Sequence, residues 1–370
     1  IRSNDDETTR DTITYIMKVI KYSENLRLVL LTANPMFNQP DEIVWIINML
    51  LANENHSLIS QSIFTNGVLT PEGEQILRNV CRGHVSYMRG ENPVSFPLRL
   101  YPEGPMMLTK DMSYTSSYVN GTTESLEFLE LYSTYLKHHQ KKVYKRALAT
   151  LDTTDTFTFE EETQLLQIGD IVFPHTNPDD ELQEYYGSRG FDRCFTHNKG
   201  VYTYKPEILE NFGTFLHVSE LSKYSCKFAS MIREIHKSEG MEFIYTNWIK
   251  GCLIPLSLML EQNGYLPYNS KPTLSETPDT RHGSYIAITP EKMGSPQQLQ
   301  TWLSVATSSD NADGSTIKII IGSSVAAEGL DFKHIRAIHI LEPWRNLNKL
   351  EQVIGRGVRN CSHKALSPEK

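Results

Sequence analysis

From about Ser219 onward, short apolar runs with strand character alternate with longer amphipathic segments with helix character. Strands that are separated by helices pair in parallel, because each helix carries the chain back across one face of the sheet. We therefore expect an α/β fold with a parallel sheet, whose ligands bind at the carboxyl ends of the strands. In order, the expected segments are the helix KFASMIREIHKS, the strand MEFIYT, the helix IPLSLMLEQNG, the strand SYIAIT, the helix PQQLQTWLSVAT, the strands IKIIIG and RAIHIL, and a helix from near Asn346.

The N-terminal part of the chain contains one more strand-and-helix pair. The run LRLVLL, residues 26–31, has the composition of a buried parallel strand, and Thr32 and Asn34 follow it directly. PDEIVWIINMLLAN comes next, and Pro40 with Asp41 predicts the start of a helix there. The residues after the strand would then lie at its carboxyl end.

The middle of the chain is expected to be mainly helical. ESLEFLELYSTYLKHHQKKVYKRAL, residues 124–148, has an apolar stripe at helical spacing formed by Leu129, Tyr132, Leu136 and Val143. Its last turns are basic, which the helix dipole favours, and a solvated helix end explains this more simply than a nucleic-acid contact. Residues 151–215 suggest no chemistry.

The composition excludes some classes of protein. With 39% apolar and 22% charged residues the chain has an ordinary globular composition, and its net charge of −8 argues against a protein that coats polyanions. Five scattered cysteines without a C-x-x-C pair suggest neither disulfides nor a zinc site, so we expect a reducing, intracellular compartment and no metal ligand in this chain. The longest apolar run, GCLIPLSLML, is too short to span a bilayer.

An arginine-rich segment, QVIGRGVR, lies near the end of the sequence. The apolar spacing before it predicts a helix that ends at about Gly355, so Arg356 would lie at its last turn and Arg359 just beyond it. Arginine forks fit phosphate oxygens, and glycines let a backbone approach a bulky anion. The alternative is a pair of surface arginines that bind Asp or Glu and contribute little.

A second segment, SSVAAEGLDF, follows the expected strand IKIIIG at the end where parallel sheets bind ligands. Its small residues Ser323, Ser324 and Gly329 permit the close approach of a backbone, and Asp331 could orient neighbouring donors. An ordinary strand-to-loop junction would have a similar composition. Its position in the same predicted domain as the two arginines favours a functional role.

Read in order, LLTANPMFN, FIYTNWIKG, SSVAAEGLDF and EPWRNLNKLEQVIGRGVR resemble motifs III, IV, V and VI of superfamily 2 helicases. More narrowly, the chain is similar to the helicase-like ATPases of nucleocytoplasmic large DNA viruses. That group includes the small subunit of the poxvirus-type early transcription factor and the nucleoside-triphosphate phosphohydrolase. RGHVSYMRGENPVSFPLRLYP and YTNWIKGCLIPLSLMLEQNGY carry the narrower likeness. The resemblance covers most of the chain and is weakest from about 104 to 215.

The resemblance implies a RecA-like helicase core. Residues 1–103 would be the C-terminal part of the first RecA-like domain, 104–218 a mainly helical insertion, and 219–370 the second RecA-like domain. ATP and Mg²⁺ would bind in the cleft between the two domains. Arg356 and Arg359 would reach the γ-phosphate, with Gln352 beside the nucleotide. The further implied residues are Gly329, Asp331 and Gly355 for nucleotide binding, and Thr32, Asn34, Thr246, Ser323 and Ser324 for nucleic-acid contact or coupling.

Two departures from the family pattern bear on function. Asn34 stands where motif III usually ends in threonine, which affects the expected coupling step. Glu328 stands where RNA-helicase relatives often carry arginine, which argues against an RNA helicase. No glycine is followed by lysine anywhere in the 370 residues, so the phosphate-binding loop is absent, as is the acidic magnesium-binding motif. We expect a piece of a longer motor, inactive alone, rather than a degenerate relative that does not hydrolyse ATP.

The expected function is therefore that of a viral ATP-dependent motor on nucleic acid, with DNA favoured, acting in early transcription. One alternative is a promoter-binding or polymerase-docking factor whose motor fold is mainly a scaffold. Another is a replication or repair helicase. The implied partners are nucleic acid and a viral RNA polymerase or a second transcription-factor subunit, with no membrane.

Overall fold

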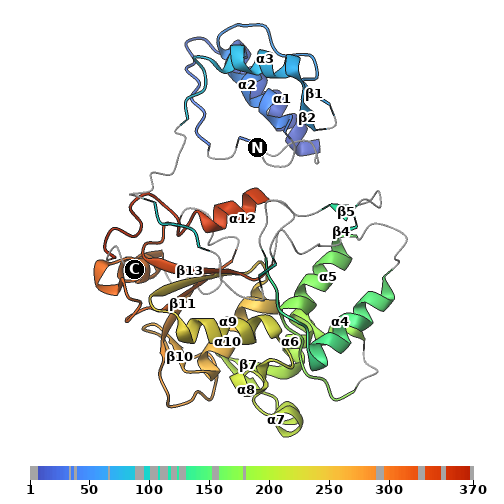
Figure 1. Cartoon of the computed structure of the whole chain (residues 1–370), viewed down its shortest axis with the longest axis vertical. Helices are drawn as coiled ribbons and strands as arrows, with labels where there is room; N and C mark the ends of the chain where they lie inside the picture. Colours follow the sequence, from blue (N-terminus) through green and yellow to red (C-terminus); the bar gives the residue numbers. More distant parts are fainter. Residues whose placement is uncertain are drawn as a thin grey trace. The chain divides into compact units, whose positions relative to one another are not determined.

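The structure, a computed structural model, divides into two units that are described separately (Figure 1). Unit 1 comprises residues 1–90 with 344–351, and unit 2 comprises residues 91–343 with 352–370. The residues described are 7–32, 35–36, 40–65, 67–87, 96–100, 107–108, 116–117, 123–124, 131–151, 158–177, 181–288, 296–323, 330–342 and 347–366. In these ranges none of the helices combines the length and apolar character needed to span a bilayer.

Unit 2 is built on a five-stranded parallel sheet with the strand order β10-β11-β12-β9-β13. Its strands are β9 Met241–Tyr245, β10 Tyr265–Pro267, β11 Gly283–Ile288, β12 Ile319–Gly322 and β13 Ile335–Ile340. Four of the five were expected from the sequence, and each lies within a residue or two of its expected bounds. The short strand β10 was not expected, because three residues that end in proline carry no strand periodicity.

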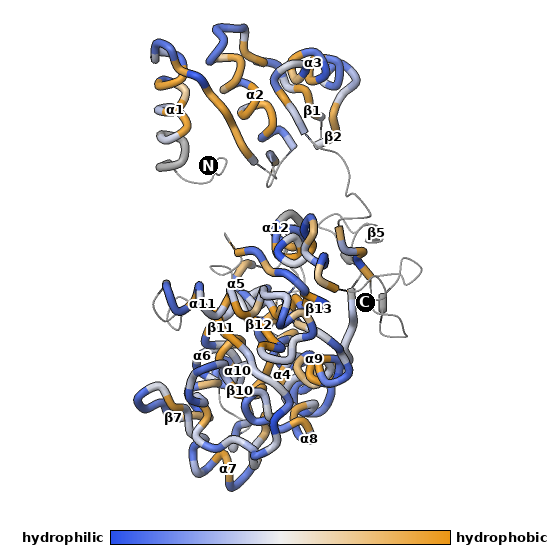
Figure 2. The backbone as a smooth tube through the Cα atoms, turned by 90° about the vertical axis from the view of Figure 1, so that its left-hand side faces the viewer, coloured by the Kyte–Doolittle hydropathy of each residue, from blue (hydrophilic) through white to orange (hydrophobic). Residues whose placement is uncertain are grey.

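Helices cover both faces of this sheet, which explains why its central strands are apolar at successive positions. Phe243 of β9 faces a buried cluster that contains residues of α11 and α12, whereas the next residue, Ile244, faces a cluster that contains residues of α9 and α10. Figure 2 shows the hydrophobic character of the sheet strands. The helix bounds are α9 Cys226–Lys237, α10 Ile254–Gln262, α11 Pro296–Ala306 and α12 Leu347–Ile354. The α/β fold with a parallel sheet is confirmed.

The chain before β9 adds further helices to the same buried core. The aromatic side chains of Phe173, Phe191 and Phe215 are buried in one cluster with Phe228 of α9. Before β9 the elements are α4 His138–Thr150, α5 Phe159–Asp170, η1 Leu182–Tyr185, α6 Gly187–Cys194, β7 Phe195–Asn198, β8 Val201–Tyr204, α7 Pro206–Phe212 and α8 Val218–Leu221. Two short helices follow later in the chain, the π-helix η2 Ile249–Leu253 and the 3-10 helix η3 Ser309–Asn311. The domain borders at 103 and 218 stay a prediction.

The single helix expected over 124–148 is wrong in its first half. β6 Leu131–Tyr132 pairs with β3 Met107–Leu108, residues 133–137 are not helical, and the helix α4 begins only at His138, which has a positive φ of 44°. Strand pairing with a distant segment thus outweighs the local helical pattern. Val143 is buried as expected, whereas Tyr132 is exposed and Leu129 lies outside the described residues. A second short hairpin joins β4 Ser116–Ser117 to β5 Thr123–Glu124.

Among its described residues, unit 1 contains the first part of α12, three further helices and a hairpin: α1 Glu7–Tyr22, α2 Glu42–Asn53, β1 Phe64–Thr65 with β2 Val68–Leu69, and α3 Pro71–Cys81. The helix expected after Pro40 is confirmed as α2. The strand expected over 26–31 is wrong, since these residues are not assigned to a strand. A parallel strand needs a neighbouring strand to bond its backbone, and here the side chain of Asn53 bonds the backbone N–H of Leu28 and the carbonyl of Leu26 instead.

Candidate functional site

The carboxyl ends of β9 and β13 are joined by the buried carboxylate of Glu342. Thr246, which follows β9, donates its hydroxyl to Glu342 Oε1 at 2.5 Å. The backbone N–H of Asn247 donates to Glu342 Oε2 at 2.9 Å. Thr246 also donates its backbone N–H to the carbonyl of Gly322, at the end of β12. The predicted coupling residue Thr246 therefore ties three strand ends together.

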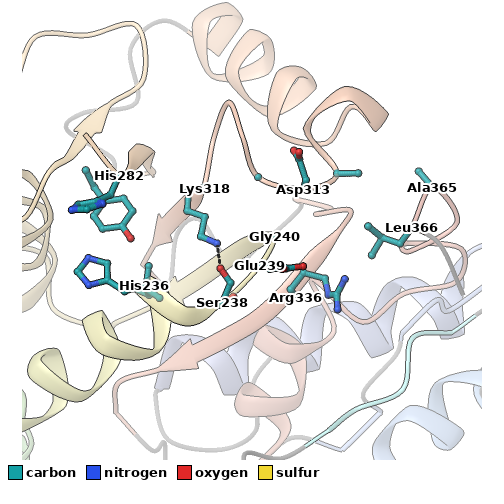
Figure 3. A pocket seen from close by; sticks show the side chains of 14 residues that line it. His236, Ser238, Glu239, Gly240, His282, Asp313, Lys318, Arg336, Ala365 and Leu366 are labelled. Carbon is teal, nitrogen blue, oxygen red and sulfur yellow. Dashed lines mark hydrogen bonds between the residues drawn. The ribbon is translucent and has the colours of Figure 1, made fainter. Parts of the chain in front are cut away.

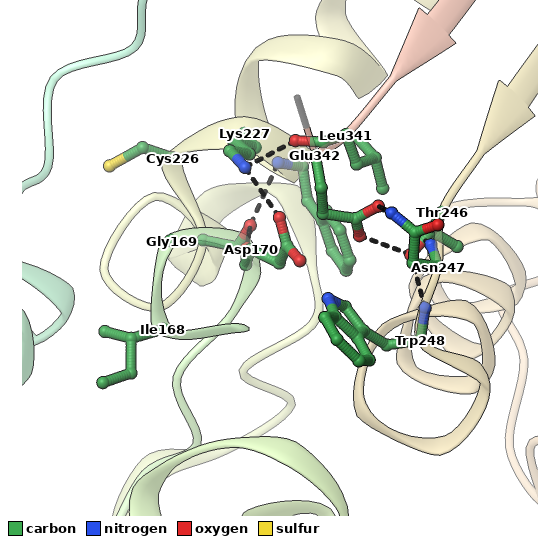
Figure 4. Close-up of polar contacts among 12 residues, drawn as sticks. Ile168, Gly169, Asp170, Cys226, Lys227, Thr246, Asn247, Trp248, Leu341 and Glu342 are labelled. Carbon is green, nitrogen blue, oxygen red and sulfur yellow. Dashed lines mark hydrogen bonds and ion pairs between the residues drawn. The ribbon is translucent and has the colours of Figure 1, made fainter. Parts of the chain in front are cut away.

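Glu342 lies in a polar cluster with Asp170, which is also buried, and Lys227, whose side chain is 26% exposed (Figure 4). Lys227 of α9 donates from Nζ to Asp170 Oδ1 at 2.7 Å and to the carbonyl of Leu341 at 2.5 Å. Asp170 is the last residue of α5 and is fully buried, and its carbonyl accepts the hydroxyl of Ser225. The cluster thus connects α5, α9 and the end of β13 by ionic contacts.

The cluster has an excess negative charge when Asp170, Glu342 and Lys227 are all ionised. Two carboxylates and one ammonium leave a net charge of −1 in a dry site, which is costly. Burial, followed by repulsion from Glu342, raises the pKa of Asp170 well above its ordinary value. Burial and the neighbouring carboxylate thus favour the protonated form of Asp170.

This cluster is unsuited to a metal ion, although ligand atoms of Asp170, Cys252 and Glu342 lie within 4.8 Å of one another. The ammonium of Lys227 already supplies the cation that the carboxylates require. Burial also raises the pKa of the Cys252 thiol well above its ordinary value, which disfavours the thiolate that binds metals. The cluster therefore connects α5, α9 and the end of β13 by its own charged groups, without a metal ion.

Ser323, the first residue after β12, carries an unusual hydroxyl. Its side chain is buried, and within the described residues its Oγ has no hydrogen-bond partner. A buried hydroxyl without a partner costs free energy, which is one mark of a functional position. The two following predicted residues of this segment, Ser324 and Gly329, lie outside the described residues, as does Asn34.

The arginine segment after α12 is bonded through its backbone to the residues just before β13, and through a side chain to the first residue of β13. Phe332 donates its N–H to the carbonyl of Arg356, and His334 donates its N–H to the carbonyl of Ser362. The imidazole of His363 lies 2.7 Å from the carbonyl oxygen of Ile335 through Nε2. The helix ends at Ile354, as the sequence predicts, and the segment that follows is held in place by these bonds.

The two predicted arginines have different surroundings. Arg356 is half-buried and donates from Nη1 to the carbonyl of Leu330 at 3.3 Å. Arg359 donates from Nε to the carbonyl of Gly355 at 2.8 Å and forms an ion pair from Nη1 to Asp331 Oδ1 at 2.6 Å. This ion pair joins two predicted site residues from separate segments, and both side chains remain substantially exposed, at 41% and 61%.

The two glycines of this segment serve the backbone in different ways. A Cβ added to Gly357 would lie 3.1 Å from Ile335 Cβ and 3.2 Å from Ile338 Cδ1, so this glycine allows the segment to pack against β13. The structure thus gives a packing reason for Gly357, and the close approach of an anion expected at these glycines stays a prediction. Gly355 supplies the carbonyl that orients Arg359.

Two other predicted residues are exposed. Gln352 lies on α12 with its side chain exposed, and Thr32 is exposed in unit 1. Their expected contacts with nucleotide and nucleic acid stay predictions.

A cavity of about 990 Å³ lies at the opposite end of the sheet, before the strands begin (Figure 3). It is lined by His236 and Lys318, among others, and Lys318 donates to the carbonyl of Ser238. No predicted site residue lines this cavity. Size alone therefore does not mark the site in this protein.

Comparison with known protein families shows what the region around the arginine segment resembles. The helicase conserved C-terminal domain family matches residues 300–361, which contain Asp331, Gln352 and both arginines. Residues 300–361 are thus similar to the conserved C-terminal domain of helicases. The parallel sheet that carries this domain has the RecA-like α/β arrangement, and the expected resemblance to helicases of large DNA viruses is confirmed.

Three relatives illustrate this likeness. A presumed ATP-dependent RNA helicase of Acanthamoeba polyphaga mimivirus is 26% identical, over 96% of this chain and 35% of its own length. An early transcription factor large subunit homologue of African swine fever virus is 24% identical, over 96% and 34%. The nucleoside triphosphatase I of Melanoplus sanguinipes entomopoxvirus is 23% identical, over 98% and 52%. The chain spans about a third to a half of the length of these relatives.

These names refine two expectations. The transcription-factor relative is a homologue of the large subunit, whereas we named the small subunit. The mimivirus relative is named after RNA, so its name does not support the preference for DNA.

Sequence reasoning missed the cluster of Asp170, Lys227 and Glu342. Glu342 follows the apolar strand run directly, which is a usable signal for a residue at a strand end. Asp170 and Lys227 give no comparable signal, because they lie 57 residues apart on separate helices and meet only in the folded chain.

Proposed function

We propose that this chain is part of a viral ATP-dependent motor that moves along nucleic acid, a helicase or a duplex translocase, acting in early transcription. The observation that carries the proposal is the ion pair between Asp331 and Arg359, which joins the two segments that resemble helicase motifs V and VI. The matched helicase domain and the relatives named as helicases and nucleoside triphosphatases support it.

Residues of this chain would supply positive charge to a phosphate. The bonds to Gly355 and Asp331 use Nε and Nη1 of Arg359, and a guanidinium has five N–H donors, so others can still face a ligand. Arginine forks fit phosphate oxygens in this way. The fit of the site to ATP rests on the guanidinium of Arg359, which is held by these bonds and is 41% exposed, and ATP with Mg²⁺ would supply the hydrolysis that drives movement.

The remaining groups for ATP binding are absent from these 370 residues, since neither a phosphate-binding loop nor an acidic magnesium-binding motif occurs in the sequence. We therefore expect this chain alone not to hydrolyse ATP. Its cluster of Asp170, Lys227 and Glu342 would hold the strand ends rigid while the arginines act.

The test is the nucleic-acid-stimulated ATPase rate of the full-length protein with Arg359→Ala. An arginine finger contributes about 10³ to 10⁵ in rate, so a loss of this order is expected. Arg193→Ala is the matched control, because Arg193 is also a half-exposed arginine in an ion pair, with Glu184. An unchanged rate in Arg359→Ala would refute the role.

A second candidate is a transcription factor in which the motor fold serves as a docking scaffold. The relative named as an early transcription factor homologue favours it. Full transcriptional activity with a non-hydrolysable ATP analogue would select this candidate, whereas a motor would stop. A replication or repair helicase would instead unwind bare duplex, and parallel assays on DNA and RNA duplexes would decide the substrate.

A further inference from the structure

Three side chains with metal-binding atoms converge in unit 1, at positions that belong to none of the four segments resembling helicase motifs III to VI. They are Glu54, His56 and His84, whose ligand atoms all lie within 4.8 Å of one another. Glu54 and His56 follow the end of α2, and His84 follows the end of α3. Two imidazoles and one carboxylate are a ligand set that Zn²⁺ accepts.

The backbone holds these residues in place. The N–H of Glu54 donates to the carbonyls of Leu50 and Leu51, and the N–H of His56 also donates to Leu51. The N–H of His84 donates to the carbonyl of Cys81. The ligands are therefore attached to the last turns of two helices, which are rigid supports for a metal site.

Two of the three ligand–ligand distances lie on either side of the spacing expected around a tetrahedral ion. Glu54 Oε2 lies 2.9 Å from His84 Nε2 and 3.5 Å from His56 Nδ1. Ligands at about 2.0–2.1 Å from a tetrahedral Zn²⁺ lie about 3.3 Å from one another, a value between these two distances. The rings of His56 and His84 are nearly perpendicular, at 79°, with their centroids 6.4 Å apart.

The other ring nitrogen of His84 shows which nitrogen is available. Nδ1 lies 2.7 Å from the carbonyl oxygen of Val80. A carbonyl only accepts, so Nδ1 carries the proton, and Nε2 is the nitrogen that faces Glu54; its lone pair is available to a metal when the ring is neutral. A backbone carbonyl that fixes the tautomer in this way is the usual outer support of a metal-binding histidine.

We propose that Glu54, His56 and His84 form a zinc site that joins the ends of α2 and α3, with water at the fourth position. Glu54 and His56 are more than half exposed, which leaves room for that water. Our expectation of no metal ligand rested on cysteine spacing, which does not detect a site made of histidine and carboxylate. The proposal is independent of ATP chemistry.

The competing interpretation is a simple ion pair. Hydrogen bonding to Glu54, followed by the bond to Val80, raises the pKa of His84, which favours the protonated imidazolium. In that state Nε2 donates to Glu54 and cannot bind a metal. The experiment must therefore distinguish a metal site from a histidine–glutamate ion pair.

The test uses the 370-residue chain after removal of metal by a chelator. Zn²⁺ is titrated by calorimetry, and Co²⁺ is added as an absorption probe of tetrahedral geometry. We expect one saturating equivalent of Zn²⁺, a tetrahedral Co²⁺ spectrum, and a higher unfolding temperature with Zn²⁺, because the ion binds the folded state. His84→Gln and Glu54→Gln should each weaken binding by at least about 100-fold, the upper range for loss of an outer support.

Two control variants keep the test decisive. Glu74→Gln removes an exposed carboxylate of the same unit that is paired with Arg78, and should leave binding unchanged. His236→Gln removes a histidine that lies beside His282 in unit 2, and should also leave it unchanged. No saturating phase in the wild type, or a phase that His236→Gln abolishes and His84→Gln spares, overturns the proposal. Circular dichroism of the metal-free variants checks that they are folded.

Discussion

The guanidinium of Arg359 lies 2.6 Å from the carboxylate of Asp331, and the two residues come from segments 28 positions apart that both match the helicase C-terminal domain. An exposed ion pair of this kind stabilises a fold by at most about 1 kcal/mol. Its main consequence is therefore the orientation of Arg359.

Asp331→Asn should separate orientation from stability. The substitution keeps the size of the side chain but removes the charge that holds Arg359. We expect the unfolding free energy to change by less than about 1 kcal/mol. The nucleic-acid-stimulated ATPase rate of the full-length protein should fall by about 10²-fold, as expected when a reacting group is misplaced by about 1 Å. A stability loss without a rate loss would contradict this assignment.

Gly357→Ala should destabilise unit 2. The new Cβ would lie 3.1 Å from Ile335 Cβ and 3.2 Å from Ile338 Cδ1. Both contacts are tighter than normal, so β13 or the arginine segment must shift. Overpacking of this kind costs about 1–3 kcal/mol. Gly169→Ala is the matched control, because its nearest outside atom is Lys227 Nζ at 3.9 Å, an ordinary contact. Thermal unfolding of both variants would decide, and equal midpoints would show that the segment can yield.

Lys227→Met should be strongly destabilising. The change leaves the carboxyls of Asp170 and Glu342 buried without their cation, and breaking a buried ion pair from one side costs about 3–5 kcal/mol. Replacing Asp170 by Asn at the same time should restore part of the loss, since one of the two buried carboxyls is then removed. A double-mutant cycle by urea unfolding measures this coupling. Additive losses would mean that the residues do not interact.

The pH dependence of stability should report on Asp170. Its folded pKa is raised, by burial and then by Glu342, so its proton binds more tightly in the folded state. The resulting stabilisation is fully present below the unfolded pKa of about 3.9 and is lost as the pH rises through the folded value.

Asp170→Asn mimics the protonated form and lacks this titration. The stability of the variant relative to the wild type should therefore increase as the pH rises above about 4 and level off once Asp170 has ionised. Unfolding temperatures of both proteins across the pH range would provide the measurement. A constant difference between them would contradict the raised pKa.

The sheet of unit 2 was predictable because its strands are buried on both faces. Met241–Tyr245 and Ile319–Gly322 are buried at every position, and such runs stand out in a sequence. The end of α12 was equally clear from the glycines that follow it. Local sequence patterns predict these elements correctly because an uninterrupted apolar run marks each buried strand and glycines mark the end of the helix.

The errors arose where distant segments decide the local structure. Leu131 and Tyr132 fit a helical stripe but pair with Met107 and Leu108 instead. The predicted strand at 26–31 is bonded by the side chain of Asn53. Neither partner is visible from a sequence window, and the same holds for the meeting of Asp170 with Lys227.

β13 is an outer strand of the sheet, with β9 as its only strand neighbour among the described residues. An uncovered outer strand is a template on which other chains can add, and proteins protect such strands to stay soluble. The segment after α12 bonds to Phe332, His334 and Ile335 and so covers the beginning of this strand. The segment that carries the arginines therefore also protects the outer strand β13. A substitution that loosens this segment would promote aggregation, even where it does not affect phosphate chemistry.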